Sequence, residues 1–214
     1  MSCAEQVLNL VTADGAGQAR LTLGGQGGVP VRHHFTVSTH IFNSIELNLQ
    51  TRHQVLLLAN DLSGYPELGN ISVRTDLGDD RRGQVLMELL RIARDSCRAQ
   101  GSLGQGTSFL IVELEGAMDH RGRSPFWKGL GHHFLPGELS ELRACGSHSW
   151  NARLAAVLPR QIIYTSMLDP KAQTSLGQPR HDQAWLSQGL LSDGFMPYRH
   201  VRIDDGGPVL ICRF

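Results

Sequence analysis

DHRGRSPFWKGLGHHF, residues 119–134, joins a predicted strand to a predicted helix. The apolar run before it, Thr107 to Leu114 (TSFLIVEL), has the length and β-branched content of a buried strand. Ser124 and Pro125 form an N-cap and first-turn proline pair, so we expect a helix to begin there. Its apolar residues recur at helical spacing: Phe126, Trp127, Leu130 and Phe134. The stretch therefore predicts a strand, a charged corner and a capped helix, and loops of this kind often carry function.

Strands are also predicted upstream of this corner. Val7 to Thr12 and Ala19 to Leu23 read as a hairpin, and His34 to Phe42 alternates in the manner of a half-buried strand. The continuous apolar run in Gln54 to Ala59 predicts a central strand. Gly24 to Val29 (GGQGGV) does not match GxGxxG between a strand and a helix, so we interpret it as a loop.

The remaining segments alternate strands with helices. Gly69 to Thr75 predicts a strand, and Gly83 to Arg98 predicts an amphipathic helix. Ile162 to Met167 is apolar and ambiguous. Further helices are expected at Glu138–Ala144, Ala152–Val157, Lys171–Gly177 and His181–Ser192, and strands at Phe195–Ile203 and Pro208–Cys212 around the turn Asp204-Asp205-Gly206-Gly207. This order predicts an α/β or α+β protein built on a sheet.

Length and charge limit the possible functions. The 214 residues suit a single domain spanning residues 1–214. The 20 basic and 20 acidic residues balance, so no basic field favours nucleic acid or an anionic membrane as a partner. No apolar stretch predicts a signal peptide or a membrane span.

The four cysteines, Cys3, Cys97, Cys145 and Cys212, show no CxxC spacing, which favours a cytoplasmic protein with buried, reduced thiols. The pairs His33-His34 and His132-His133 lack the HExxH spacing of a zinc site, so no metal site is predicted.

Four blocks carry a resemblance to a known family: GRSPFW, HQVLLLANDLSGYPEL (residues 53–68), LPRQIIY (158–164) and DGF...IDDGGPVL (193–210). Together they resemble the arginine N-succinyltransferase family, from about Val11 onward. The resemblance implies a GNAT-like fold, which is a mixed, mostly antiparallel sheet flanked by helices. Relative to the family, the chain lacks an N-terminal strand and two helices, so one sheet edge is expected to need cover from a second copy or a partner chain.

The resemblance implies transfer of a succinyl group from succinyl-CoA to the α-amine of arginine. Succinyl-CoA, or another acyl-CoA, would be a co-substrate rather than a permanently bound cofactor. In such folds the start of the long helix holds the CoA diphosphate, because free backbone N–H groups and the helix dipole favour an anion. Here that corner reads Gly78-Asp79-Asp80-Arg81-Arg82-Gly83-Gln84. Arg81, Arg82, Gly83 and Gln84 would contact CoA, whereas the two aspartates would repel it or only compensate the helix dipole.

Candidate substrate residues lie in or beside the matching blocks. A guanidinium prefers a bidentate carboxylate, and the candidates for that role are Glu67, Glu113, Glu115 and Asp119. The succinyl carboxylate needs a cation, for which Arg121 or Arg123 is near the corner. We also place Ser124 at the substrate corner, as a helix cap rather than a nucleophile.

The family's proposed proton donor is a histidine that follows GQV, and here Arg180 occupies that position with His181 next to it. Because arginine stays protonated, we assign the role to His181. The family's acyl-CoA contact on a strand corresponds to Ile71. Three hypotheses result: an active acyltransferase, a catalytically degenerate subunit that pairs with a full-length relative, and a binding module for CoA or an amino acid.

Overall fold

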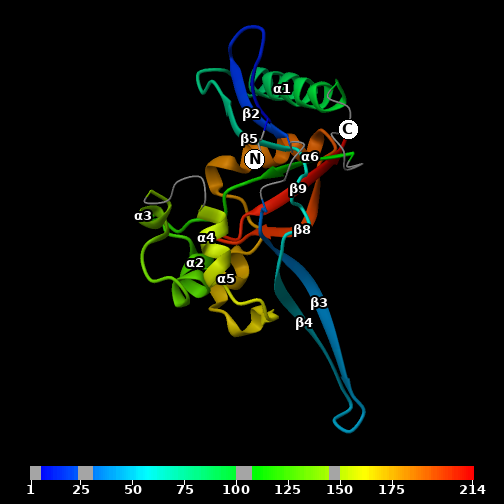
Figure 1. Cartoon of the computed structure of the whole chain (residues 1–214), viewed down its shortest axis with the longest axis vertical. Coiled ribbons are helices and arrows are strands. Elements are labelled where there is room, and N and C mark those ends of the chain that lie inside the picture. Colours follow the sequence, from blue (N-terminus) through cyan, green and yellow to red (C-terminus); the bar gives the residue numbers. More distant parts are fainter. Residues whose placement is uncertain (1–5, 24–30, 100–107, 145–149) are drawn as a thin grey trace, which may run out of the picture.

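The sheet at the centre of the molecule is seen in a computed structural model that describes residues 6–23, 31–99, 108–144 and 150–214. Its strand order is β1-β2-β5-β6-β9-β8-β3-β4-β7 (Figure 1). The strands are β1 (Gln6–Val11), β2 (Gly17–Leu23), β3 (His34–Ser44), β4 (Leu49–Ala59), β5 (Glu67–Val73), β6 (Phe109–Glu113), β7 (Ile163–Tyr164), β8 (Met196–Arg202) and β9 (Pro208–Arg213). β5 and β6 run parallel, while the other neighbouring pairs are antiparallel. The predicted mixed, mostly antiparallel sheet with helices is confirmed.

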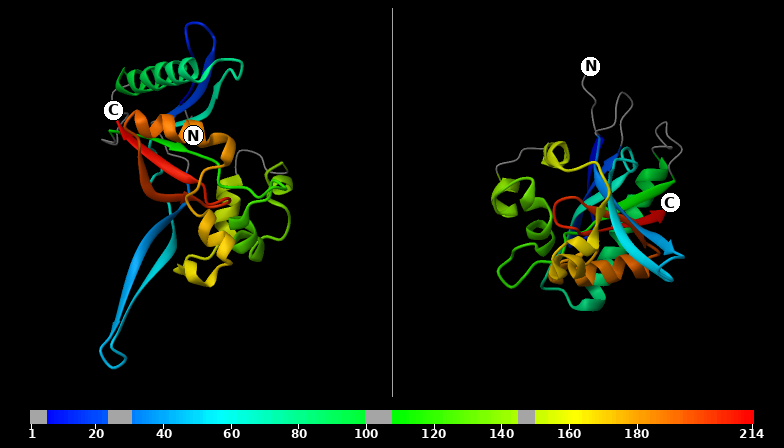
Figure 2. Two further views of the ribbon diagram at one scale, coloured as in Figure 1. Left: turned by 180° about the vertical axis from the view of Figure 1, so that it is seen from behind. Right: turned by 90° about the horizontal axis from the view of Figure 1, so that it is seen from below.

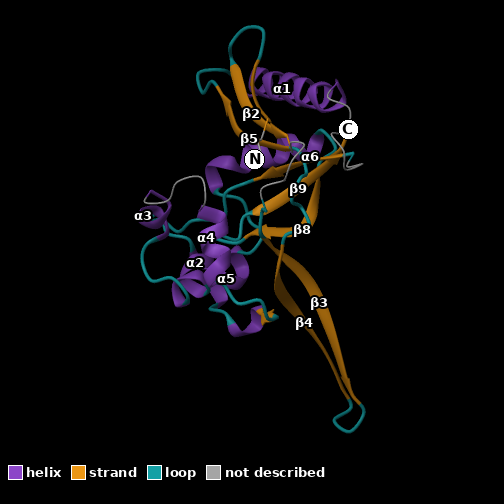
Figure 3. Cartoon of the chain, viewed as in Figure 1, coloured by secondary structure: helices purple, strands orange, loops and turns teal. Residues whose placement is uncertain are grey.

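The helices form two groups (Figure 3). The long helix α1 (Asp79–Ala99) and α6 (Ala184–Ser192) lie near the β1–β2–β5 end of the sheet, whereas four short helices gather beside β8 and β3. These four are α2 (Pro125–Gly129), α3 (Leu139–Ala144), α4 (Trp150–Val157) and α5 (Pro170–Ser175). The described ranges also contain three single-turn 3-10 helices: η1 (Gly131–His133), η2 (Thr165–Met167) and η3 (His181–Gln183). None of the helices in the described ranges is both long and apolar enough to cross a membrane.

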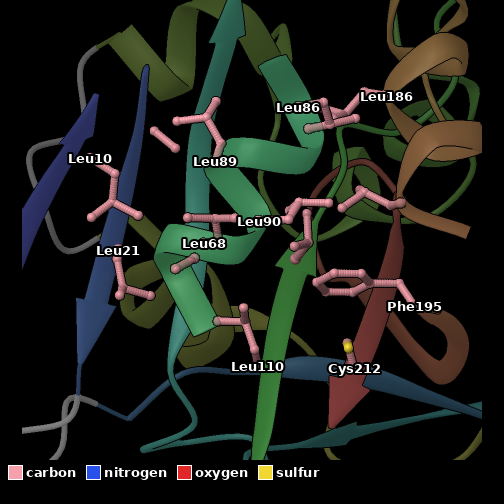
Figure 4. Close-up of a cluster of buried hydrophobic side chains, with 14 of the residues drawn as sticks. Leu10, Leu21, Leu68, Leu86, Leu89, Leu90, Leu110, Leu186, Phe195 and Cys212 are labelled. Atoms are coloured by element: carbon pink, nitrogen blue, oxygen red, sulfur yellow. The ribbon is translucent and has the colours of Figure 1, made fainter. Parts of the chain in front are cut away.

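The larger core lies between α1 and the sheet. Leu86, Leu89 and Leu90 of α1 are buried over β2, β5 and β6, where they meet Leu21 and Leu68 (Figure 4). Gly17 on β2 allows this close approach, since a Cβ there would lie 2.5 Å from Val85. The predicted amphipathic helix is therefore confirmed, although it begins at Asp79, four residues before the predicted start.

A second core lies under the four short helices. Ser124 caps α2 with Pro125 in its first turn, as predicted, and Phe126 and Trp127 are buried. The prediction that the apolar face continues to Phe134 is wrong, because α2 ends at Gly129 and Phe134 is 41% exposed. The chain turns at Gly131, where the Trp127 ring lies so close that a Cβ would be 2.2 Å from it.

Strands β3 and β4 form a hairpin that projects from the body (Figures 1 and 2). β3 pairs with β8 only at residues 34–36, and β4 pairs with β7 only at residues 55–56. Residues 37–54 are thus a two-stranded ribbon, with exposed apolar side chains at Ile41, Phe42, Ile45, Leu47 and Leu49. The prediction that residues 54–59 form a central strand is wrong, since β4 lies next to the edge strand β7.

Two of the four cysteines lie in described parts of the chain. Cys97 and Cys212 are buried free thiols, as expected, and burial raises the pKa of Cys97 to about 11. Cys3 and Cys145, and the predicted loop at residues 24–29, lie outside the described residues. The ambiguous segment 162–167 divides into the short strand β7 and η2.

Candidate functional site

The parallel strands β5 and β6 part soon after they meet. Their one recorded ladder pair is Glu67 with Ile111, where the Ile111 N–H donates to the Pro66 carbonyl at 2.9 Å. Beyond this pair a cleft of about 170 Å³ opens between the strands. It is lined by residues 67–71, residues 112–115, Gln183, Leu186 and Arg202. Backbone groups on the facing edges are therefore available to a ligand rather than to a ladder.

A β-bulge lies beside this cleft on β5. Asn70 and Ile71 together face Ala19 of β2, because the register shifts between Gly69 and Ser72. Asn70 has a φ of 50°, in the left-handed region that asparagine tolerates better than most residues. Bulges re-aim strand residues, and they are common next to active sites. The bulge brings the predicted acyl-CoA contact, Ile71, onto the wall of the cleft.

The segment that precedes α6 closes one end of the cleft. The Glu115 N–H donates to Gln183 Oε1 at 2.9 Å, and the Arg180 N–H donates to the Glu115 carbonyl at 2.7 Å. The Arg180 guanidinium contacts the carboxylates of Glu115 and Asp182. The hydrogen bonds that Arg180 donates to Asp182 are the main reason that the pKa of Arg180 is raised, so Arg180 keeps its proton. His181 is exposed in the first position of η3, next to this closure.

Three of the predicted substrate carboxylates line the cleft, Glu67, Glu113 and Glu115, and all three already have partners. Glu67 contacts Arg32, and Glu113 Oε1 lies 2.8 Å from His34 Nε2. Burial raises the pKa of Glu113, but the hydrogen bond from His34 and the charges of His34, Arg202 and Arg32 together hold it well below its ordinary value. Glu113 is therefore in place as an anion beside the cleft.

Residues 79–82, which were predicted to be a loop, form the start of helix α1. The helix already includes Asp79, so Arg81 to Gln84 occupy its first turns. The Asp79 and Asp80 side chains are exposed and do not line the cleft. Arg81 Nη2 lies 2.5 Å from Asp14, and the Arg82 guanidinium lies 4.4 Å from the centroid of the Trp185 ring on α6. The positive end of a 21-residue helix thus carries two arginines, an arrangement that favours an anion.

A second pocket of about 380 Å³ adjoins the predicted corner. Glu115 lines both this pocket and the cleft. Five basic residues line the second pocket: Arg123, Lys128, His132, Arg143 and Arg180. The acidic side chains in its wall are Glu115 and Glu138, so the lining has an excess of positive charge.

The corner itself is held by Asp119. Its carboxylate accepts the N–H groups of Arg121 and Arg123 at 2.8 and 2.9 Å, and it also pairs with the Arg123 guanidinium. The backbone bond from Arg123 is the main reason that the pKa of Asp119 is lowered to about 2. Arg123 and Ser124 line the second pocket, whereas Arg121 and Asp119 do not.

Ser124 acts as a helix cap in this structure. Its hydroxyl accepts the Trp127 N–H at 3.1 Å, and the residue is only 2% exposed. We expect Ser124→Ala to lower the free energy of unfolding by about 1 kcal/mol, the usual cost of losing an N-cap. Urea denaturation would measure it, with Asp169→Ala, which removes the cap of α5, as the matched comparison. A loss of catalytic turnover without any loss of stability would contradict the capping role.

Sequence reasoning missed a buried charge cluster below the second pocket. Asp204 and Asp205 form the turn between β8 and β9 and are almost fully buried. Arg143 bonds to both carboxylates at 2.6 and 2.7 Å, and the Trp150 Nε1–H donates to Asp204 at 3.0 Å. Arg202 lies 3.2 Å from Asp205. The cluster joins the wall of the second pocket to the wall of the cleft, because Arg143 lines the first and Arg202 the second.

The predicted site residues therefore form three neighbouring groups. The cleft is lined by Glu67, Ile71, Glu113 and Glu115. The second pocket is lined by Arg123, Ser124 and Glu115. The third group, at the start of α1, consists of Arg81, Arg82, Gly83 and Gln84. Sequence reasoning missed Arg32, Asn70, Gln183, Arg143 and Arg202. Of these, only Asn70 could have been found from the sequence, because a glycine within a strand pattern, here Gly69, often marks a bulge. Within the described ranges, no group of three or more His, Cys, Asp or Glu residues could hold a metal ion.

Known proteins resemble the chain over most of its length. Residues 17–214 match the family model described as arginine N-succinyltransferase beta subunit (AstA). The arginine N-succinyltransferase of Enterobacter sp. (strain 638) is 30% identical over 184 residues, which are 84% of this chain and 51% of that protein. The protein of the same name from Yersinia enterocolitica is 29% identical over 178 residues, 83% of this chain and 50% of that protein.

A solved structure has a similar fold. It is that of arginine/ornithine succinyltransferase subunit AI from Pseudomonas aeruginosa, with a TM-score of 0.70 and 26% identity. The similarity covers 94% of this chain and 57% of that one. The chain thus spans about half the length of the curated relatives it matches.

Proposed function

We propose that this chain, which belongs to the arginine N-succinyltransferase family, binds an acyl-CoA in the β5–β6 cleft and transfers the acyl group to the amine of arginine or a similar amino acid. The opening of the parallel pair beside a β-bulge carries this proposal. A thioester placed there would have backbone N–H groups beside its carbonyl oxygen, which gains negative charge in the transition state.

The start of α1 supports the CoA half of the proposal. Arg81 and Arg82 would contact the diphosphate through charge-assisted bonds, together with the free N–H groups of the first helical residues, Asp79 to Arg81. Gly83 and Gln84 lie one turn further along α1, where N–H groups bond within the helix. The Asp79 carboxylate extends into solvent, so it leaves the approach from the cleft side open.

The amine must lose a proton before it attacks, and the thiolate gains one as it leaves. We assign protonation of the thiolate to His181, which stands beside the closed end of the cleft. Arg180 is unsuitable for that step because it remains charged and is bound by two carboxylates.

Substrate selection is assigned to the second pocket and its junction with the cleft. Of the four predicted carboxylates, Glu115 is the best placed for a cationic acceptor, since it lines both cavities. All four carboxylates have partners within the chain, and that of Glu115 is Arg180, so an acceptor bound there would share Glu115 with Arg180. Arg123, with Lys128 beside it, would bind the carboxylate of a succinyl group, and Arg121 lies outside the pocket.

CoA binding tests the proposal directly. With CoA at one hundred times its dissociation constant, we expect a gain of about 2.7 kcal/mol in unfolding free energy, seen as a higher melting temperature. Gly69→Leu should abolish the shift, because Gly69 lines the cleft and a larger side chain there would occupy it. Among the described residues, only Glu67 Oε1, at 3.6 Å, would lie within 4 Å of a Cβ at this position. Ser72→Leu, at an exposed position on the same strand, should keep the shift. No shift in the unaltered chain would refute CoA binding.

A further inference from the structure

Arg32 joins the two strands that form the cleft. It precedes β3, and its guanidinium contacts Glu67 of β5 while its Nη1 lies 3.9 Å from Glu113 Oε1 of β6. Glu67 belongs to the one recorded ladder pair, and Glu113 lies two residues beyond Ile111 on the facing strand. A single cation therefore bridges two carboxylates at the point where β5 and β6 part.

The backbone of Arg32 is fixed from two directions. Its N–H donates to Ser63 Oγ at 3.0 Å, in the loop after β4. The next residue, His33, exchanges two hydrogen bonds with the side chain of Asn151 on α4, each 2.8 Å long. An arginine held at its base loses less conformational freedom when its guanidinium bridges two groups.

Glu67 depends on this cation more than Glu113 does. Their side chains are only 20% and 16% exposed, and His34 engages Glu113 but not Glu67. Without Arg32, Glu67 would be a poorly solvated charge, and the bridge that ties it to Glu113 across β5 and β6 would be lost.

We infer that Arg32 is a positioning residue that sets the separation of β5 and β6, and thereby the fit of the acyl-CoA chain in the cleft. This inference rests on the proposed function. Arg32 acts through Glu67 and Glu113, because it does not itself line the cleft. A guanidinium suits the bridge, since its planar fork can engage two carboxylates at once.

The test measures CoA affinity by calorimetry together with the melting temperature. We expect Arg32→Met to weaken CoA binding about tenfold, because the bridge between Glu67 and Glu113 is lost and the cleft no longer has its fixed width. Arg32→Lys should restore part of the affinity by keeping the charge. Arg91→Met removes an arginine from an exposed ion pair with Asp95 on α1 and should change neither quantity.

A double variant separates positioning from simple stability. The double variant Arg32→Met, Glu67→Gln removes the uncompensated charge of Glu67 but does not restore the bridge between β5 and β6. The melting temperature should therefore recover, whereas the affinity for CoA should stay low. Recovery of both together would show that the ion pair serves folding alone and would overturn the inference, as would normal affinity in Arg32→Met. Failure of the unaltered chain to bind CoA would instead refute the proposed function on which the inference rests.

Discussion

Asp204→Ala is expected to lower the free energy of unfolding by about 3–5 kcal/mol, the usual cost of removing one partner from a buried ion pair. The carboxylate accepts bonds from Arg143 and from Trp150, and Arg202 is within 3.4 Å of it. Without it, two partly buried arginines, Arg143 and Arg202, would share the single carboxylate of Asp205. Urea denaturation would measure the change. Asp95→Ala, which removes an exposed carboxylate from α1, should cost less than about 1 kcal/mol.

The effect of Asp204→Ala should depend on pH. Burial raises the pKa of Asp204, but the charges of Arg202 and Arg143 lower it overall to about 2. Because the folded-state pKa lies below the unfolded value of about 3.9, the stabilisation is present above about pH 4. It is lost as the pH falls from about 4 to 2. The difference between the variant and the unaltered chain should therefore shrink across that range, and a constant difference would contradict the ion-pair explanation.

His181→Ala is expected to lower turnover with succinyl-CoA and arginine about a hundredfold, while the dissociation constant for CoA stays within about twofold. The reason is that a proton donor acts on the departing thiolate and contributes little to ground-state binding. Steady-state kinetics and calorimetry on the same preparation would separate the two quantities.

A histidine on the projecting ribbon provides the control for this result. His53→Ala removes an imidazole that packs edge-to-face against Phe42 and Tyr164, outside both cavities, and should leave turnover unchanged. If His181→Ala weakened CoA binding as much as turnover, the residue would hold ligand rather than donate a proton.

The sequence predicted the local features of this fold well. The capped start of α2, the cap of α5 at Asp169 and the amphipathic helix α1 all follow from spacing and from one or two capping residues. The mixed sheet also followed, because helices alternate with strands along the chain. These features depend on neighbours within a few residues, which sequence patterns report directly.

Features that depend on contacts between distant segments could not be predicted in the same way. Nothing in the apolar run of residues 54–59 shows that β4 would lie near an edge, because its neighbour β7 comes a hundred residues later. Arg32 and Gln183 likewise gain their importance from groups on other strands. The site residues chosen by resemblance fell near the cavities, whereas their partners did not appear in any motif.

The structure also gives a physical reason for two of the family-like blocks. Gly206 has a φ of 70° and faces Phe126, so that a Cβ would lie 2.8 Å from the ring. At Gly207 a Cβ would lie 2.1 Å from the Leu114 carbonyl oxygen. The IDDGGP turn and the GRSPFW corner are thus packed against one another, and each block limits what the other can contain.

The position of β9 has a consequence for synthesis of the chain. Residues 208–213 pair with β6 on one side and β8 on the other, so the middle of the sheet is completed by a strand made about a hundred residues after β6. Contacts of such long sequence separation slow folding. During translation, the β6 edge that pairs with β9 would lack its backbone hydrogen-bond partners until β9 emerged, and the apolar side chains of β6 would be incompletely covered. Chaperone capture during translation should therefore be strongest over that interval.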